Sequence, residues 1–129
     1  MKPSELIDSM TRKETLKSQL IHILEAFQQM DYHKLNQLLD EGYYEDMPKT
    51  AFIYKQKRIF TYLQQKGDTQ LHLSTNICTG CLCGKPVFVF TGNHSGLTYG
   101  VYVAFLNDAI VDVFRCSEQS SSSFGLMPF

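Results

Sequence analysis

Three cysteines stand close together in the middle of the chain, at Cys78, Cys81 and Cys83. A Cys-x-x-Cys spacing lets two sulfurs face one ion and forms half of many structural zinc sites. A closed zinc site takes four ligands, so Cys83 is a candidate third ligand and the fourth comes from elsewhere. Closely spaced thiols in a turn can also form a disulfide. The segment therefore has three interpretations: a metal site, a redox-active pair, or a plain loop between two strands.

The fourth cysteine, Cys116, is not expected to complete a metal site within one chain. If the strands expected after residue 69 form an antiparallel meander, Cys116 lies level with about Leu73 on the first strand. Cys78 is then five residues further along, about 16 Å away at ~3.3 Å per residue, whereas zinc–sulfur bonds are ~2.3 Å long. His72 and His94 are also expected to lie away from this loop. We expect no resident cofactor, and zinc bound with a ligand from a partner chain is the alternative.

Length, charge and hydropathy exclude several classes of protein. The chain has 129 residues, which suits one domain. Its 12 basic and 13 acidic side chains leave no basic excess for binding nucleic acid. Its apolar runs are only a few residues long, against the ~20 that a membrane-spanning helix needs. The amino-terminal segment MKPSELIDSM lacks the apolar core of a signal peptide. The sequence predicts a cytoplasmic protein that binds neither nucleic acid nor membranes.

The first half of the chain has the apolar spacing of helices, and the second half has that of strands. Apolar side chains recur every three to four residues in the helical segments and alternate with polar ones in the first strand. The predicted helices span residues 11–27, the segment between Asp31 and Gly42, and residues 50–66. The predicted strands span residues 71–78, 86–91, 98–106 and 110–116.

This order predicts an α+β domain over residues 1–117, with three N-terminal helices packed on a curved antiparallel sheet. Because the later strands are apolar on both faces, the second face of the sheet needs a cover. We expect a partner subunit to supply it, which predicts a homodimer through the sheet. Residues 118–129 form a polar, serine-rich tail that we expect to be frayed, with docking of its terminal segment 124–129 left open as an alternative.

The order of the elements resembles that of the nuclear transport factor 2-like superfamily, which includes ketosteroid isomerases and SnoaL-like cyclases. The resemblance also rests on the segment 38–46, followed by a helix with Phe52, Ile59 and Phe60. It implies a cone-shaped, cystatin-like fold, dimers formed through the sheet, and a pocket between the sheet and the helices. Many such domains have no known activity, and a fold alone assigns none.

The resemblance implies a pocket whose polar candidates are Tyr44, Asp46 and Gln56. The function expected first is non-catalytic: binding of a small apolar ligand, or service as an interaction module. The alternative is an isomerase-type enzyme, because Glu45 and Asp46 are similar to the Glu-Asp-Pro segment that carries the general base of ketosteroid isomerases. Such chemistry also needs an oxyanion partner, for which Asp112 is the candidate. In a third interpretation Asp46 only begins a turn.

Overall fold

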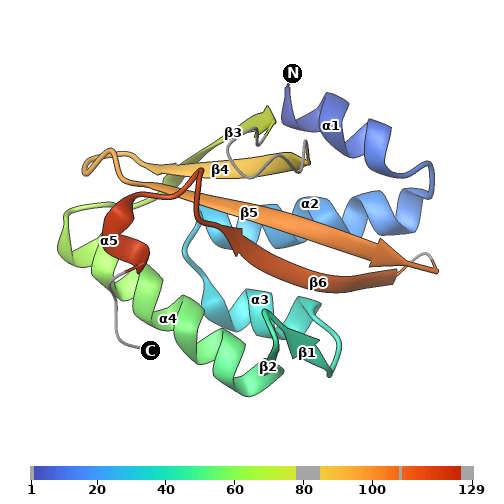
Figure 1. Ribbon diagram of the computed structural model, residues 1–129, viewed down its shortest axis with the longest axis horizontal. Coiled ribbons are helices and arrows are strands. Elements are labelled where there is room, and N and C mark those ends of the chain that lie inside the picture. The colour runs from blue at the N-terminus through green and yellow to red at the C-terminus, as the bar shows by residue number, and fades with distance from the viewer. Residues whose placement is uncertain (1, 78–84, 108, 126–129) are drawn as a thin grey trace.

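The computed structural model describes residues 2–77, 85–107 and 109–125, and it has an α+β fold, as predicted (Figure 1). Four antiparallel strands form the main sheet in the order β3-β4-β5-β6, and β1 and β2 form a separate two-stranded sheet. The elements are α1 (Pro3–Met10), α2 (Glu14–Gln28), α3 (Tyr32–Leu38), β1 (Tyr43–Tyr44), β2 (Met47–Pro48), α4 (Lys49–Gln65), β3 (Leu71–Ile77), β4 (Pro86–Gly92), β5 (Thr98–Leu106), β6 (Ala109–Cys116) and α5 (Ser122–Gly125).

The predicted helices and strands are present with small shifts at their ends. Asp31 caps α3 by accepting a hydrogen bond from the backbone N–H of Lys34 at 3.0 Å, the role that side-chain oxygens take at helix starts. Gly67 follows the end of α4 with a φ of +99°, a backbone conformation that favours glycine. The described chain has four helices before the main sheet instead of three, because α1 precedes the predicted set.

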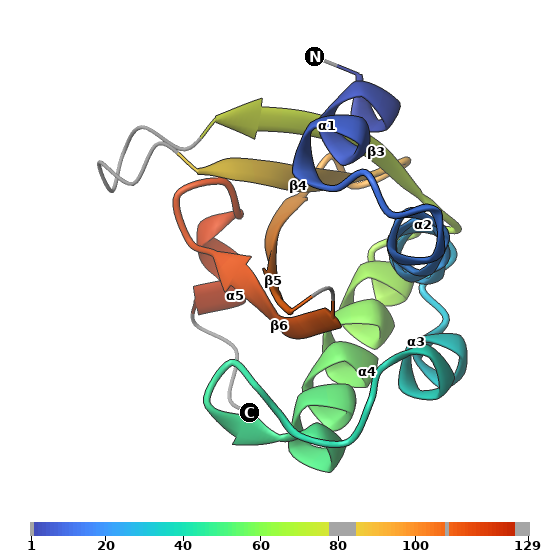
Figure 2. The same ribbon diagram turned by 90° about the vertical axis from the view of Figure 1, so that its right-hand side faces the viewer.

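The sheet curves from β3 to β6, and its concave face holds the main core against α2 and α4 (Figure 2). Phe27 of α2 lies at the centre of this core, with 1% of its surface exposed. Its ring stacks on Phe90 at 5.2 Å between centroids and meets Phe60 edge-on at 5.9 Å. These are favourable aromatic geometries. Aromatic side chains therefore fill much of the space in which the sequence predicted a pocket.

The strand register corrects the predicted level of Cys116 by one residue. Cys116 pairs with Gly100 on β5, Gly100 pairs with Val89 on β4, and Val89 pairs with Ser74 on β3. Cys116 is thus level with Ser74 and not with Leu73. The difference arises because hairpin register depends on turn geometry, which the alternation of apolar residues does not determine.

The outer face of the sheet carries a second, smaller core inside one chain. Val87, Val89, Tyr102 and Cys116 are exposed by no more than 8% and form one apolar cluster. Gln119 contributes to the cover, because a Cβ added at Gly100 would lie 2.7 Å from the Cβ of Gln119. Part of the apolar second face is therefore buried within the chain, without the partner subunit that the sequence analysis invoked for it.

The described part of the serine-rich tail packs on the fold and is not frayed as predicted. Ser121 and Thr98 share three hydrogen bonds, and Ser120 Oγ accepts one from the backbone N–H of Gly100 at 2.9 Å. These bonds continue the pairing of β5 beyond the end of β6. Phe124 of α5 then enters the main core, with 1% of its surface exposed. The docking that the sequence analysis left open for the terminal segment is thus present at Phe124.

Candidate ligand-binding sites

Tyr44, the first predicted pocket residue, is a packed core side chain. It is 3% exposed, its hydroxyl donates to the backbone carbonyl of Asp40 at 2.8 Å, and its ring lies 5.4 Å from that of Phe52. Burial, with smaller contributions from nearby carboxylates, raises the pKa of Tyr44 above its ordinary value. Tyr44 therefore holds the β1–β2 hairpin on α4 as a neutral phenol.

Gln56, the second predicted pocket residue, is fully buried in the main core. Its Oε1 accepts a hydrogen bond of 3.0 Å from the hydroxyl of Tyr99, and its Nε2 has no partner among the described residues. Burial raises the pKa of Tyr99, so this phenol remains a donor. Gln56 and Tyr99 thus form a polar pair inside an otherwise apolar core.

Asp46, the third predicted pocket residue, lies in the tight turn of the β1–β2 hairpin. Tyr44 pairs with Met47, so the turn has two residues, Glu45 and Asp46, with φ angles of +52° and +61°. Two-residue turns with both φ angles positive favour Asn-Gly, because other side chains are strained in this conformation. Asp46 is exposed. No hydrogen bond or ion pair holds its carboxylate within the part of the chain that the structure describes.

Asp46→Gly is therefore expected to stabilise the protein by about 0.5–1 kcal/mol, because glycine adopts a positive φ without steric strain. Urea unfolding measures the change. Asp46→Ala is the control, since alanine removes the same carboxylate and keeps a Cβ in the strained conformation, and it should lower stability. Loss of stability in Asp46→Gly would mean that the carboxylate contributes to the fold.

Glu45 fastens this strained turn to the rest of the protein. Its carboxylate pairs with Lys55 of α4 and accepts a hydrogen bond of 2.9 Å from the backbone N–H of Arg115. Its own backbone N–H donates to Oδ1 of Asp112 at 3.0 Å. The side chains of Glu45 and Lys55 are each only 12% exposed. The turn is thus tied to α4 and to β6 through one residue.

A charged pocket of about 400 Å³ opens beside this turn. We use the name "charged pocket" for the space lined by Glu45, Asp46, Lys55, Asp112, Phe114 and Arg115. Asp46 and Asp112, the two residues of the alternative enzymatic interpretation, both line it, whereas Tyr44 and Gln56 do not. Sequence reasoning missed Lys55 and Arg115 as site residues. The contact of β1 with β6 brings Arg115 to the turn, and the contact of the hairpin with α4 brings Lys55 there. No local sequence pattern signals either contact.

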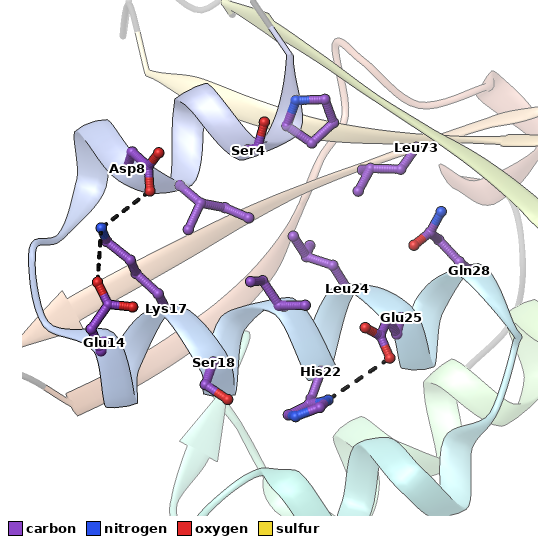
Figure 3. Close-up of a pocket in the computed structure, with 13 residues that line it drawn as sticks. Ser4, Asp8, Glu14, Lys17, Ser18, His22, Leu24, Glu25, Gln28 and Leu73 are labelled. Atoms are coloured by element: carbon purple, nitrogen blue, oxygen red, sulfur yellow. Dashed lines mark ion pairs between the residues drawn. The ribbon is translucent and has the colours of Figure 1, made fainter.

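A second, more apolar hollow lies between α1, α2 and β3, which we call the α1–α2 groove (Figure 3). Its volume is about 550 Å³, within the ~300–1,000 Å³ typical of small-molecule sites. Ile7, Ile21, Leu24 and Leu73 supply apolar surface. Ile21 keeps 42% of its surface exposed there. The sequence analysis did not find this site, because it depends on α1, and no helix was predicted before residue 11.

Charged side chains form the rim of the α1–α2 groove. Lys17 lies between Asp8, at 3.1 Å, and Glu14, at 3.6 Å, as Figure 3 shows. Its hydrogen bond to Asp8 is the largest cause of its raised pKa, so it stays charged. His22 approaches Glu25 at 3.8 Å on the other side. The rim thus carries more acidic than basic groups.

Asp68, just after α4, is a buried carboxylate that sequence reasoning also missed. It is 3% exposed and accepts three hydrogen bonds, from the backbone N–H groups of His94 and Ser95 at 2.8 and 2.7 Å and from Ser95 Oγ at 2.6 Å. Burial alone would raise the pKa of Asp68, but these bonds outweigh it and lower the pKa. The turn between β4 and β5 is thereby fixed to the end of α4.

The predicted metal or redox site at Cys78, Cys81 and Cys83 lies outside the described residues. Within the described ranges, no group of three histidine, cysteine or acidic residues could hold a metal ion. Cys116 is buried, and its thiol donates to the hydroxyl of Tyr102 at 3.3 Å.

Comparisons with known proteins identify no relative. No family model, no curated protein and no solved structure matches this chain. In the described parts of the chain, every helix is too short or too polar to cross a bilayer. The two hollows and their chemistry are therefore the basis for any functional proposal.

Proposed function

We propose that this protein is a non-catalytic binding domain that holds a small apolar molecule in the α1–α2 groove. The observation that carries the proposal is the groove itself: about 550 Å³ of space in which Ile7, Ile21, Leu24 and Leu73 present apolar surface beneath a polar rim. Ligand sites typically combine an apolar lining with a few polar groups that orient the ligand.

Charge on the rim narrows the ligand class. Asp8, Glu14 and Glu25 line the groove together with a single lysine, Lys17. Lys34 also pairs with Glu25, at 3.3 Å. The three carboxylates therefore face two lysines, and one negative charge remains in excess. A ligand with an apolar body and one positive group complements this arrangement, because an excess carboxylate attracts a cation and repels an anion. The proposed ligand is thus an apolar amine.

The position of Asp46 supports binding over catalysis. An isomerase-type general base acts beside an oxyanion partner in a site that excludes water. Asp46 is exposed at the tip of a hairpin, whereas the buried phenol of Tyr99 donates to Gln56 inside the core. Asp112, the other candidate partner, accepts a hydrogen bond from the backbone of Glu45 beside the same open pocket.

Titration calorimetry with two matched probes, octylamine and octanoate, tests the proposal. At pH 7 the amine is a cation and the acid an anion on the same apolar chain, and we expect the amine to bind roughly tenfold more tightly or better. Ile21→Ser should weaken amine binding roughly tenfold, because it removes apolar surface from the groove.

Val111→Ser on β6 is the matched control, because Val111 and Ile21 are both 42% exposed. This variant should bind octylamine as the unmodified protein does. Equal binding of both probes would refute the charge argument, and equal loss in both variants would place the binding outside the groove.

The homodimer through the sheet remains a prediction from the sequence. One exposed apolar side chain on the outer face of the sheet supports it: Leu106 at the end of β5, on the same face as Tyr102 by the alternation of the strand, is 62% exposed. Exposed apolar surface is common on single chains too. Light scattering at increasing protein concentration tests the prediction, and a constant monomer mass would contradict it.

A further inference from the structure

The charged pocket contains a basic group that the fold does not use. Arg115 is half-buried, and its backbone N–H is bonded to Glu45. Among the described residues, no hydrogen bond or ion pair engages its guanidinium group, although three carboxylates line the same pocket. Lys55, the other base, is already paired with Glu45. The guanidinium of Arg115 is thus available to a ligand.

The chemistry of a guanidinium group defines the first half of that ligand. Its five N–H donors form a planar fork that matches the two oxygens of a carboxylate. Such a pair gains strength where the arginine is shielded from water, as the half-buried Arg115 is. The part of the ligand that meets Arg115 is therefore a carboxylate.

The remaining acidic groups define the second half. Glu45 is committed to Lys55 and to the backbone of Arg115, and Asp112 uses Oδ1 for the backbone of Glu45. The carboxylate of Asp46 has no such partner among the described residues. With three acidic and two basic side chains, the pocket has a net charge of −1. A simple carboxylate would add to this excess, whereas a ligand that also carries an ammonium group would not.

We propose that the charged pocket binds a small zwitterion of the α-amino-acid class, with its carboxylate on Arg115 and its ammonium group on Asp46. Phe114 is the apolar residue in the lining of the pocket and lies beside the side chain of such a ligand in this proposal. The pocket volume of about 400 Å³ has room for a molecule of this size. The Glu45–Lys55 pair holds the turn, and hence Asp46, in place. This site is separate from the α1–α2 groove, and the two proposals do not depend on each other.

Titration calorimetry with three probes of one carbon skeleton tests the inference: leucine, 4-methylpentanoate and isopentylamine. Leucine carries both charges, and each of the others carries only one. We expect leucine to bind roughly tenfold more tightly than either, because each charge-assisted contact contributes about this much. Equal binding of leucine and 4-methylpentanoate would overturn the role of Asp46. Failure of leucine to bind at millimolar concentration would overturn the site.

Variants locate the binding. Arg115→Gln and Asp46→Asn should each weaken leucine binding roughly tenfold to a hundredfold. Arg58→Gln removes an arginine from α4 that contacts Tyr54 outside the pocket, and it should leave binding unchanged. Ile21→Ser, in the groove, should also leave leucine binding unchanged. Because Asp46→Asn keeps the size of the side chain at an exposed position, it tests the site even if Arg115→Gln does not fold. Unchanged leucine binding in Asp46→Asn would overturn the assignment.

Discussion

Phe124→Ala is expected to lower the free energy of unfolding by about 3–5 kcal/mol, the range for truncating a buried phenylalanine. Phe124 is 1% exposed, and its ring lies 5.4 Å from Tyr99 and 5.9 Å from Tyr62. Alanine would leave a cavity between α4, α5 and β5, and it would also weaken the docking of the tail. Guanidinium unfolding at pH 7 measures the loss.

Tyr43→Ala is the control for this prediction, because Tyr43 is also aromatic but is 69% exposed. Its substitution should change stability by no more than about 0.5 kcal/mol. If both variants were equally stable, the docking of Phe124 would contribute nothing and the frayed tail expected from the sequence would describe the protein correctly.

Asp68→Ala is expected to destabilise the protein by about 3 kcal/mol, because it leaves three hydrogen-bond donors of the β4–β5 turn without their buried acceptor. Gly92 shows how tightly this carboxylate fits: a Cβ at position 92 would lie 2.1 Å from Oδ2 of Asp68. Asp68→Asn keeps the shape and one acceptor oxygen, so a smaller loss of about 1–2 kcal/mol is expected. Urea unfolding at pH 7 compares the two.

The lowered pKa of Asp68 adds a dependence on pH. When the pKa of a carboxylate is lower in the folded than in the unfolded state, the unfolded state binds protons more readily. Lowering the pH therefore favours unfolding. The contribution of the Asp68 charge to stability is fully present well above the ordinary pKa of 3.8. It is lost as the pH falls through that value towards the pKa of Asp68 in the folded state. The stability difference between the unmodified protein and Asp68→Asn should therefore shrink from pH 7 to pH 3.

Glu118→Gln is the control for this pH dependence, since Glu118 is exposed. It should leave the loss of stability at low pH unchanged. A difference between the unmodified protein and Asp68→Asn that stays constant from pH 7 to pH 3 would contradict the role given to the charge of Asp68.

The sequence predicted the sheet well because alternation is a local signal. The ends of the four strands were placed within about one residue, since each strand carries its own pattern of apolar side chains. The second and third predicted helices had similarly clear signals in Asp31, which caps α3, and in Gly67, which follows α4. Features that depend on about ten consecutive residues could thus be predicted from the sequence.

The candidate sites were harder to predict because they depend on contacts between distant segments. Glu45 meets Arg115 only because β1 lies beside β6, and the two residues are 70 positions apart. A turn at Asp46 was one of the interpretations of the sequence, but its two-residue type was not predicted, since Glu45 and Asp46 occupy positions where Asn and Gly are usual. Gln56 was predicted as a pocket residue, and its partner inside the core, Tyr99, follows only from the register of β5.

The docking of the tail also has a consequence for protein synthesis. Ser120 and Ser121 complete the hydrogen bonding of β5, and Phe124 completes the main core. A ribosome-bound chain therefore exposes part of the edge of β5 until these residues emerge, and exposed strand edges favour aggregation. The main core is thus complete only after Phe124 has been made, and a chain interrupted before this residue would lack that part of the core.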